Sequence, residues 1–317
     1  CAVSLVAEIA EGASGAAAQG PQAKAAGRAG VAADQVGAPI ATEGSIAAGG
    51  DVLGAGARKE THYHGEEPLS PKAMREAYLR HLLSRVSQVP LSGIDPKAAS
   101  DSEARLELRA VYTGLRTLTP EECQRLEDRD GLAPAHVERS RLSALAQLDR
   151  HDRLVLLGNP GSGKSTFVNF VALCLAGEIL GLEEANLSRL TEPLPPDDER
   201  DRDEEPEPQP WSHGSLLPVH VVLRDFAARG LPPSGERATA KHLWDFIVGE
   251  LQSAALGDYE KPLAQELLKQ GGLLLLDGLD EVPEAERRRE QIKQAVAHFA
   301  GTFGKCRILV TSRTYAY

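Results

Sequence analysis

The chain has 317 residues, which is enough for one large domain or two ordinary ones. Its apolar content of 42% can supply a hydrophobic core, and its net charge of −11 excludes nucleic-acid binding driven by bulk electrostatics. The four cysteines form no C-x-x-C pair, and no apolar run reaches the roughly 20 residues that cross a bilayer. We therefore expect a cytoplasmic protein with no membrane partner and no direct nucleic-acid site.

Residues 1–69 are predicted to be a mostly flexible region rich in Ala and Gly. Such a composition buries too little surface to offset the entropy lost on ordering, although Ala2 to Ala10 fits a short helix. Because the chain begins with Cys1 rather than Met and stops at Tyr317 soon after a predicted strand, we expect a piece of a longer protein. A lipid-modified N-terminal cysteine is the alternative explanation of the first residue.

Residues 70–150 are predicted to form a small helical region. A helix is expected over 70–89, because Pro71 suits a first helical turn and an apolar stripe follows it. Residues 103–118 carry a weaker signal that fits a strand or a helix, and residues 135–148 fit an amphipathic helix. The stripe of the first helix consists of Tyr78, Leu82, Leu83 and Val86.

A phosphate-binding pattern follows this region. Residues 158–166 match G-x-x-x-x-G-K-S/T, with an apolar strand predicted at 153–157 and a helix predicted from Phe167 to Leu180. Glycines let the backbone fold around a phosphate chain, and the start of the helix adds partial positive charge. We expect Lys164 to reach the β- and γ-phosphates and Ser165 to hold Mg²⁺; the alternative is a glycine-rich turn without a ligand. The predicted nucleotide-binding residues are Gly158, Asn159, Pro160, Gly161, Ser162, Gly163, Lys164, Ser165 and Thr166.

Residues 191–214 interrupt the core with an acidic, proline-rich run. This composition predicts a disordered surface insert, with a docking site for a basic partner as the alternative. Beyond it, apolar strands alternate with helices, which is typical of a parallel sheet covered on both faces, so we expect residues 151–317 to form an α/β core. The predicted strands after the insert are 217–223, 272–277 and 307–311, and the predicted helices are 240–251, 259–269 and 284–302.

Acidic residues follow the second of these strands. Asp277 stands at the end of this strand. In enzymes with a phosphate-binding loop (P-loop, here residues 158–166), a carboxylate at this place helps to hold Mg²⁺ beside the serine of the loop. Asp280 and Glu281 come within the next turn, and either of them can accept a hydrogen bond from a water that attacks the γ-phosphate. Arg313 comes just after the last strand and is placed to contact that γ-phosphate. The alternatives are an acid cluster that caps the next helix and a surface arginine at a strand end.

Together these motifs resemble the NACHT branch of the signal-transduction NTPases with numerous domains (STAND). That branch pairs a G-x-P-G-x-G-K-S loop (Walker A) with an apolar strand ending in D-G-h-D-E (Walker B) and a later strand ending in T-S-R. The three motifs stand here at 158–166, 277–281 and 311–313. Residues 111–116 are similar to a stretch that lines the adenine pocket of relatives, which implies that role for Tyr112 and Thr113; alternatively, Tyr112 packs against the preceding helices.

The resemblance covers roughly residues 75–317 and implies a P-loop NTPase fold. This fold is a three-layer α-β-α sandwich with a parallel sheet, here preceded by the small helical region. The family's sheet has five strands in the order 5-1-4-3-2, and the fifth strand and a winged-helix histidine would come after Tyr317. Effector and sensor modules would likewise lie outside this part of the protein.

The resemblance further implies a nucleotide-dependent signalling switch. ADP would hold a closed monomer, and exchange for ATP would permit self-oligomerisation and activation of a fused or recruited effector. Slow, Mg²⁺-dependent hydrolysis of the β–γ phosphoanhydride would reset it. The composition resembles bacterial members, in which anti-phage defence (innate immunity) is a common role. An AAA+-like working ATPase and a nucleotide-binding scaffold without turnover are the alternatives, and the preference for ATP or GTP stays open.

Overall fold

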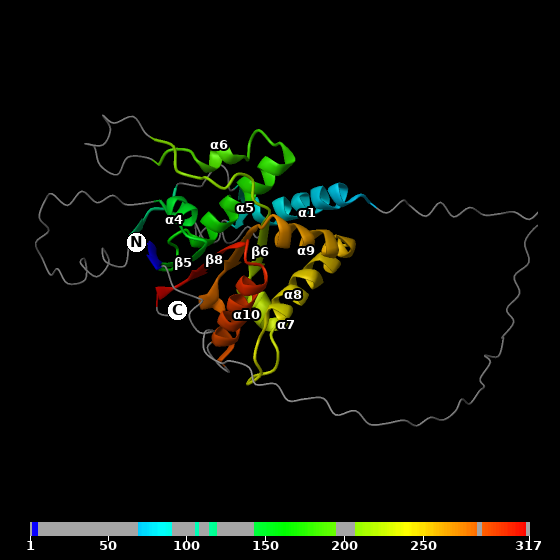
Figure 1. Ribbon diagram of the computed structural model, residues 1–317. Coiled ribbons are helices and arrows are strands. Elements are labelled where there is room, and N and C mark those ends of the chain that lie inside the picture. Colours follow the sequence, from blue (N-terminus) through cyan, green and yellow to red (C-terminus); the bar gives the residue numbers. More distant parts are fainter. Residues whose placement is uncertain are drawn as a thin grey trace, which may run out of the picture. The chain divides into compact units, whose positions relative to one another are not determined.

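The computed structural model describes residues 2–5, 69–90, 105–107, 114–118, 143–194, 207–283 and 287–314, all of which belong to one compact unit of the chain. Its centre is a parallel sheet in which four strands lie in the order β5–β8–β7–β6 (Figure 1). This is the order 1-4-3-2 that the resemblance implies for four of its five strands. The strands are β5 (Arg153–Gly158), β6 (Pro218–Val222), β7 (Leu273–Asp277) and β8 (Arg307–Ser312).

The strand side chains are buried because helices cover both faces of this sheet. In β7 the leucines from Leu273 to Leu276 are at most 2% exposed. A strand covered on both faces is apolar along its whole length, whereas a strand with one wet face alternates. Asp277 and Thr311 interrupt the apolar runs of β7 and β8 near their C-terminal ends. This end of the sheet is where the candidate site lies.

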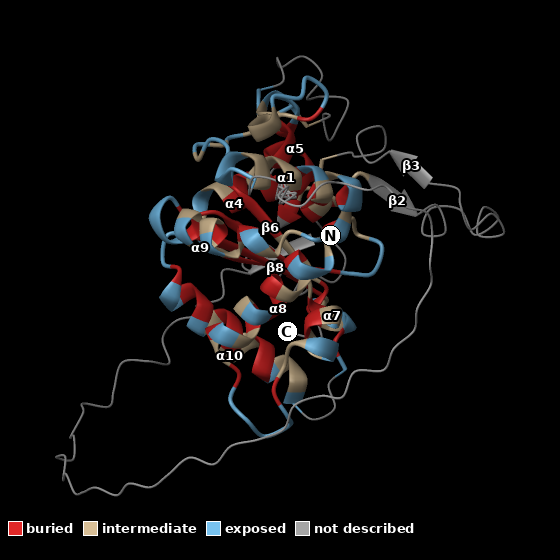
Figure 2. Ribbon diagram, turned by 90° about the vertical axis from the view of Figure 1, so that its right-hand side faces the viewer, coloured by how far each residue is buried: buried red, intermediate tan, exposed pale blue. Residues whose placement is uncertain are grey.

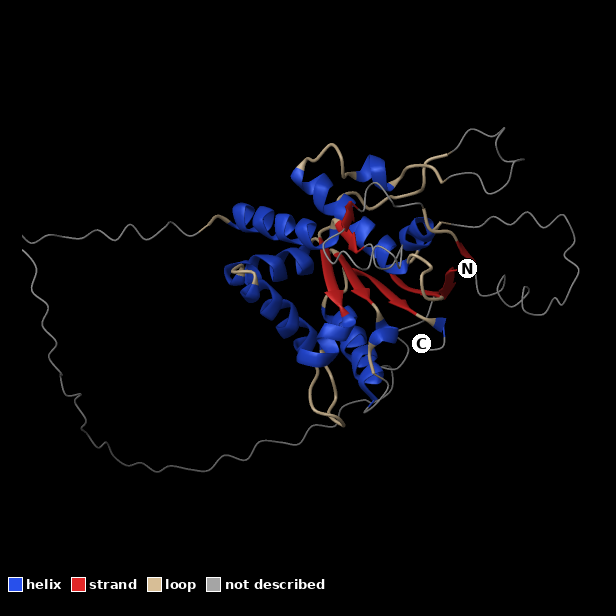
Figure 3. Cartoon of the chain, turned by 180° about the vertical axis from the view of Figure 1, so that it is seen from behind, coloured by secondary structure: helices blue, strands red, loops and turns tan. Residues whose placement is uncertain are grey.

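Two groups of helices lie on opposite sides of the parallel sheet (Figure 3). On one side α1 packs along α5 and α6 contacts α5, while on the other α8 packs along α10 and α7 contacts both. Buried residues gather on the inner surfaces of these helices (Figure 2). The described part of the chain is therefore a mixed α/β structure with a parallel sheet between helices. The helices are α1 (Pro71–Val86), α4 (Ala144–Arg150), α5 (Lys164–Leu180), α6 (Leu187–Leu190), α7 (Leu223–Arg229), α8 (Ala240–Ser253), α9 (Glu260–Lys269) and α10 (Arg288–Thr302), with 3-10 turns η4 (Gly257–Tyr259) and η5 (Leu279–Glu281).

The region before the P-loop is only partly helical. Helix α1 begins where the sequence predicts, because the Ser70 hydroxyl caps it by accepting a hydrogen bond from Ala73 N at 3.2 Å. Strand β2 (Gln88–Pro90) follows it and pairs antiparallel with β3 (Arg105–Glu107). The ambiguous signal at 103–118 thus includes β3 and, near its end, β4 (Thr117–Leu118). Of the helix predicted over 135–148, only the end is observed: α4 begins at Ala144, after the extended N-cap residue Ser143, and residues 135–142 lie outside the described residues.

An N-terminal strand lies between β4 and β5 in the main sheet. Strand β1 (Ala2–Leu5) pairs antiparallel with β5 and parallel with β4, which extends the sheet to six strands. The helix predicted for Ala2 to Ala10 is therefore wrong over β1. Pairing with an open strand edge satisfies backbone groups and outweighs the local helix preference, which Val3 and Ser4 reduce. In the strand order that the resemblance implies, the fifth strand occupies this same edge of β5.

The predicted insert at 191–214 has defined hydrogen bonds at its two ends. The backbone N–H of Gln209 donates to Thr191 O at 2.9 Å, and the Gln209 side-chain amide donates to Glu192 O at 2.7 Å. The disorder predicted for the whole insert does not extend to these ends, because the two flanks pair with each other. Residues 195–206 lie outside the described residues.

Candidate functional site

The P-loop connects the end of β5 to the start of α5. Gly161 has φ +72° and Gly163 has φ +85°, a left-handed backbone that residues with a Cβ rarely adopt. A Cβ built at either glycine would have no other atom within 4 Å, so the loop surface is open on that side. The sequence pattern predicted this loop, and the structure gives it the backbone shape that lets a phosphate group approach closely.

Lys164 is the buried cation of the site, with 9% of its surface exposed. Its Nζ donates to Gly158 O at 2.7 Å, to Asn159 O at 3.1 Å and to Ser162 Oγ at 3.4 Å. Burial lowers the pKa of Lys164 below its ordinary value, and the nearby carboxylate of Asp280 opposes that shift. The ammonium group is therefore held by the loop itself rather than by a direct ion pair, among the described residues.

A hydroxyl–carboxylate pair joins the P-loop to the end of β7. Ser165 Oγ donates to Asp277 Oδ1 at 3.1 Å, and Thr311 Oγ1 donates to the same oxygen at 2.5 Å. The Thr311 hydroxyl also accepts a hydrogen bond from Gly278 N at 2.8 Å, which fixes its orientation. Hydroxyl and carboxylate oxygens are ligands that Mg²⁺ prefers, so the donor set of Ser165 and Asp277 fits this cation.

Thr311 is a site residue to which the sequence assigned no role. It stands in the T-S-R motif, in which only Arg313 was given one. The available signal was a polar side chain directly after the apolar run Ile308–Val310 of β8. Its significance depends on β7 and β8 lying side by side, which brings the Thr311 hydroxyl to Asp277.

The two acids after β7 have different partners. Asp280 Oδ2 lies 2.6 Å from Arg313 Nε, and its side chain is only 8% exposed. Glu281 Oε2 lies 3.3 Å from Arg224 Nη1, and its side chain is 47% exposed. Asp280 is thus enclosed and tightly paired, whereas Glu281 has solvent access and a loose partner. Arg224, at the start of α7, was not predicted to belong to the site.

The structure brings most of the predicted site residues together at the carboxyl ends of the parallel strands. The P-loop, Asp277, Asp280 and Arg313 are linked by the contacts above or by the charges that act on Lys164, whereas Glu281 follows Asp280 in η5 and contacts Arg224. Tyr112 and Thr113 lie outside the described residues, so the adenine pocket stays a prediction. Within the described ranges, no group of three or more His, Cys, Asp or Glu side chains forms a preformed metal site.

His220 on β6 is a buried titratable residue close to this cluster. Neither ring nitrogen touches solvent or has a hydrogen-bond partner among the described residues. Burial lowers the pKa of His220 to about 4, against the opposing charge of Asp277. It lines a small cavity with Tyr78 and Arg85 between α1, β6 and α8. We therefore expect a neutral imidazole at physiological pH.

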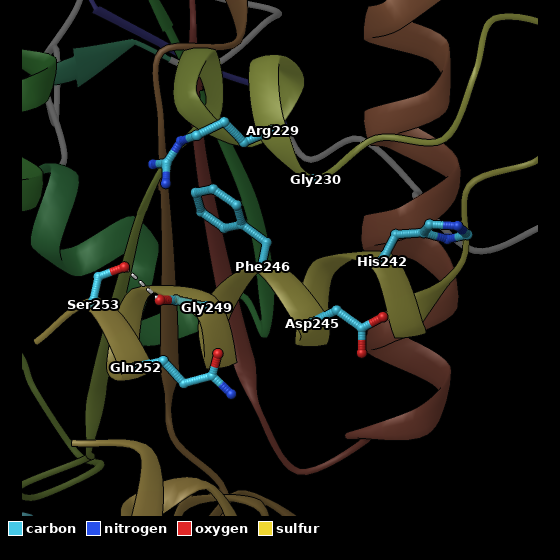
Figure 4. A pocket seen from close by; sticks show the side chains of 8 residues that line it. All are labelled: Arg229, Gly230, His242, Asp245, Phe246, Gly249, Gln252 and Ser253. Carbon is cyan, nitrogen blue, oxygen red and sulfur yellow. Dashed lines mark hydrogen bonds between the residues drawn. The ribbon is translucent and has the colours of Figure 1, made fainter. Parts of the chain in front are cut away.

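A larger groove than this cavity lies elsewhere, along α7 and α8 (Figure 4). Its volume is about 680 Å³, and it shares no residue with the cluster at the strand ends. The Arg229 guanidinium lies over the Phe246 ring, 5.0 Å from its centroid, and also pairs with Glu250 at 2.9 Å. These side chains are committed to each other, so the groove offers no convergent set of free polar groups. Its lining residues are Arg229, Gly230, His242, Asp245, Phe246, Gly249, Gln252 and Ser253.

Comparison with family models, with curated proteins and with solved structures found no match. The resemblance to the NACHT branch therefore stays a prediction that depends on the motifs. Among the described helices, none is both long enough and apolar enough to span a membrane.

Proposed function

We propose that the chain binds ATP and ADP with Mg²⁺ at the carboxyl ends of β5, β7 and β8, and hydrolyses ATP slowly as a signalling switch. The observation that carries the proposal is the hydrogen bond between Ser165 and Asp277, which lie 112 residues apart in the sequence. Taken alone, the first motif could be a glycine-rich turn without a ligand and the second an acid cluster that caps a helix. Here the two meet at one point, in the arrangement that a P-loop NTPase needs. This contact, together with the strand order, supports a P-loop NTPase fold of the NACHT type.

The residues at this point have complementary tasks. The backbone N–H groups of the P-loop and the Lys164 ammonium bind the phosphates, since both present positive charge at the open loop. Ser165 and Asp277 hold Mg²⁺, which neutralises phosphate charge when bound. Thr311 keeps the Asp277 carboxylate in place through its hydrogen bond.

Glu281 is the better placed of the two acids to orient the attacking water. A carboxylate in that role needs an oxygen free to accept a hydrogen bond and access to solvent. Asp280 lacks access because it is nearly enclosed and paired with Arg313, whereas Glu281 is about half exposed. We therefore assign water orientation to Glu281 and conformational coupling to the Asp280–Arg313 pair.

The switch follows from a contact that only one nucleotide makes. Arg313 pairs with Asp280, and a γ-phosphate competes for the same guanidinium, whereas ADP has no such group. A shift of Arg313 between these partners gives the two nucleotides different interaction energies with the protein. Self-oligomerisation and activation of a fused or recruited effector are the proposed outputs, and a role in anti-phage defence is an analogy with bacterial members of the family.

The test is equilibrium binding of Mg·ATP and Mg·ADP to the purified chain and to Lys164→Met. We expect the substitution to weaken both affinities at least about 100-fold, or about 2.7 kcal/mol, because it removes the only lysine of the P-loop. Lys241→Met, an exposed lysine on α8, is the matched control and should bind as the unaltered chain does. Equal affinity of Lys164→Met and the unaltered chain would remove the proposal.

A further inference from the structure

The start of α7 lies beside the turn that carries Glu281. Val222, the last residue of β6, is the register partner of Asp277, the last residue of β7. Helix α7 begins at the next residue after β6, and η5 ends four residues after Asp277. Arg224 and Glu281 are therefore brought together by strand pairing, and α7 and η5 pack against each other.

The side chain of Glu281 has a close neighbour on each of two sides. On one side lies Gly278, whose φ of +83° is a left-handed conformation. A Cβ at Gly278 would lie 3.4 Å from Glu281 Cδ, an ordinary contact distance, so the Glu281 side chain lies directly beside the Gly278 backbone. On the other side, Arg224 Nη1 contacts Oε2 at 3.3 Å. Arg224 itself is 63% exposed, and of its two ion pairs within the described part of the chain the one to Glu281 is shorter than the one to Asp225, at 3.8 Å.

We propose that Arg224 is a positioning residue that holds the Glu281 carboxylate over Gly278, in the orientation needed to align the attacking water. The inference rests on the proposed function and adds to it a residue that the motifs do not contain. One guanidinium contact to Oε2 leaves Oε1 to accept a hydrogen bond from water. Because the pair is exposed, its effect is modest, and we expect a loss of about five- to tenfold in the hydrolysis rate rather than abolition.

The experiment compares ATP affinity with the single-turnover rate of bound ATP for the complete 317-residue chain. Arg224→Gln should lower the rate about five- to tenfold and leave the ATP dissociation constant within about twofold. Arg224→Lys, which keeps a cation with poorer geometry, should recover part of the loss. Arg229→Gln is the matched control, because it removes an arginine from the same helix. The partner of Arg229 is Glu250, which lies away from the site.

A double-variant cycle distinguishes positioning from a structural role. In a Glu281→Gln background, Arg224→Gln should have no further effect on the rate, because the carboxylate it positions is gone. An additive loss, or a weakened ATP affinity in Arg224→Gln alone, would overturn the inference and make Arg224 a direct phosphate contact. Failure of the unaltered chain to bind ATP at all would instead refute the proposed function, and is seen before any Arg224 variant is made.

Discussion

Two buried cations stand at opposite ends of the parallel strands and serve different purposes. Lys164 at the carboxyl end and Arg307 at the amino end are 9% and 7% exposed, and burial lowers the pKa of both. Arg307 contacts the carboxylate of Asp152 and donates to Leu148 O and Asp149 O at the end of α4. Lys164 instead bonds to loop carbonyls and a hydroxyl beside an open backbone.

A buried charge alone therefore does not identify a binding site. Carbonyls at a helix end together with a carboxylate bind both Nη groups of Arg307 and anchor α4 to β8, while its buried Nε has no hydrogen-bond partner among the described residues. The partners of Lys164 belong to a loop whose glycines leave room for an incoming group. The amino end is therefore an anchor of the fold, and the carboxyl end is available to a ligand.

The largest expected effect separates these two cations. Arg307→Met should lower the free energy of unfolding by about 2–4 kcal/mol, since it leaves buried carbonyl groups without their donor. It should leave nucleotide affinity unchanged in the folded protein. Lys164→Met should show the opposite result, with nearly unchanged stability and lost binding. Urea unfolding and nucleotide titration measure the stability and the nucleotide affinity of both variants. A variant that loses both stability and affinity would contradict the separate roles of the two cations.

The buried imidazole of His220 predicts a pH dependence of stability. Its folded pKa of about 4 lies below the ordinary value of 6.5, so the unfolded chain takes up the proton first. The stability contribution is complete above about pH 6.5 and is lost as the pH falls towards 4. Between pH 7 and 5 the loss should be about 2 kcal/mol.

Replacing His220 by Leu isolates this contribution. Other titrating groups affect both proteins alike, so the unfolding free energy of the unaltered chain should fall by about 2 kcal/mol relative to that of His220→Leu from pH 7 to 5. Parallel curves for the two proteins in denaturant titrations would show that His220 is protonated equally in the folded and unfolded states.

Thr311→Val tests the support of the proposed Mg²⁺ site. The substitution keeps the volume of the side chain and removes the hydroxyl that orients Asp277. We expect Mg²⁺-dependent ATP affinity to fall about tenfold, as is typical when the group behind a metal ligand is lost. Affinity measured in EDTA provides the reference, and an equal loss with and without Mg²⁺ would show that Thr311 acts only on the fold.

The smallest effect is expected from deletion of residues 195–206. The flanks of this insert pair with each other through Gln209 and Thr191, which brings the two ends together without the intervening residues. Nucleotide affinity and unfolding free energy should both change by less than about 0.5 kcal/mol. A larger loss of affinity would favour a regulatory or docking role for the acidic run.

The parallel strands and the glycine-rich turn between β5 and α5 could be predicted well from the sequence, because both depend on local patterns, whereas phosphate binding by that turn stays a prediction. Apolar runs ending in a glycine-rich loop or in Asp277 are readable without knowing their neighbours. The contacts of Thr311 with Asp277 and of Arg224 with Glu281 were missed because they depend on which strands pair and in what register. The strand at Ala2–Leu5 was missed for the same reason, as its pairing with β5 is set by distant residues.

Helix α7 could not be predicted from the sequence pattern either. It follows β6 without an intervening loop and has only seven residues, which is too short for a convincing helical period. Its position nevertheless decides where Arg224 lies. A short element between two predicted ones thus contributes a site residue that neither pattern contains.

The most direct measurement of the central claim is identification of the nucleotide released when the purified protein is denatured by heat. A switch that traps its product at the carboxyl ends of the strands predicts ADP in nearly one-to-one ratio, together with Mg²⁺, and its absence from Lys164→Met. A protein that releases no nucleotide, and in which neither Mg·ADP nor Mg·ATP binds on addition, would contradict the account.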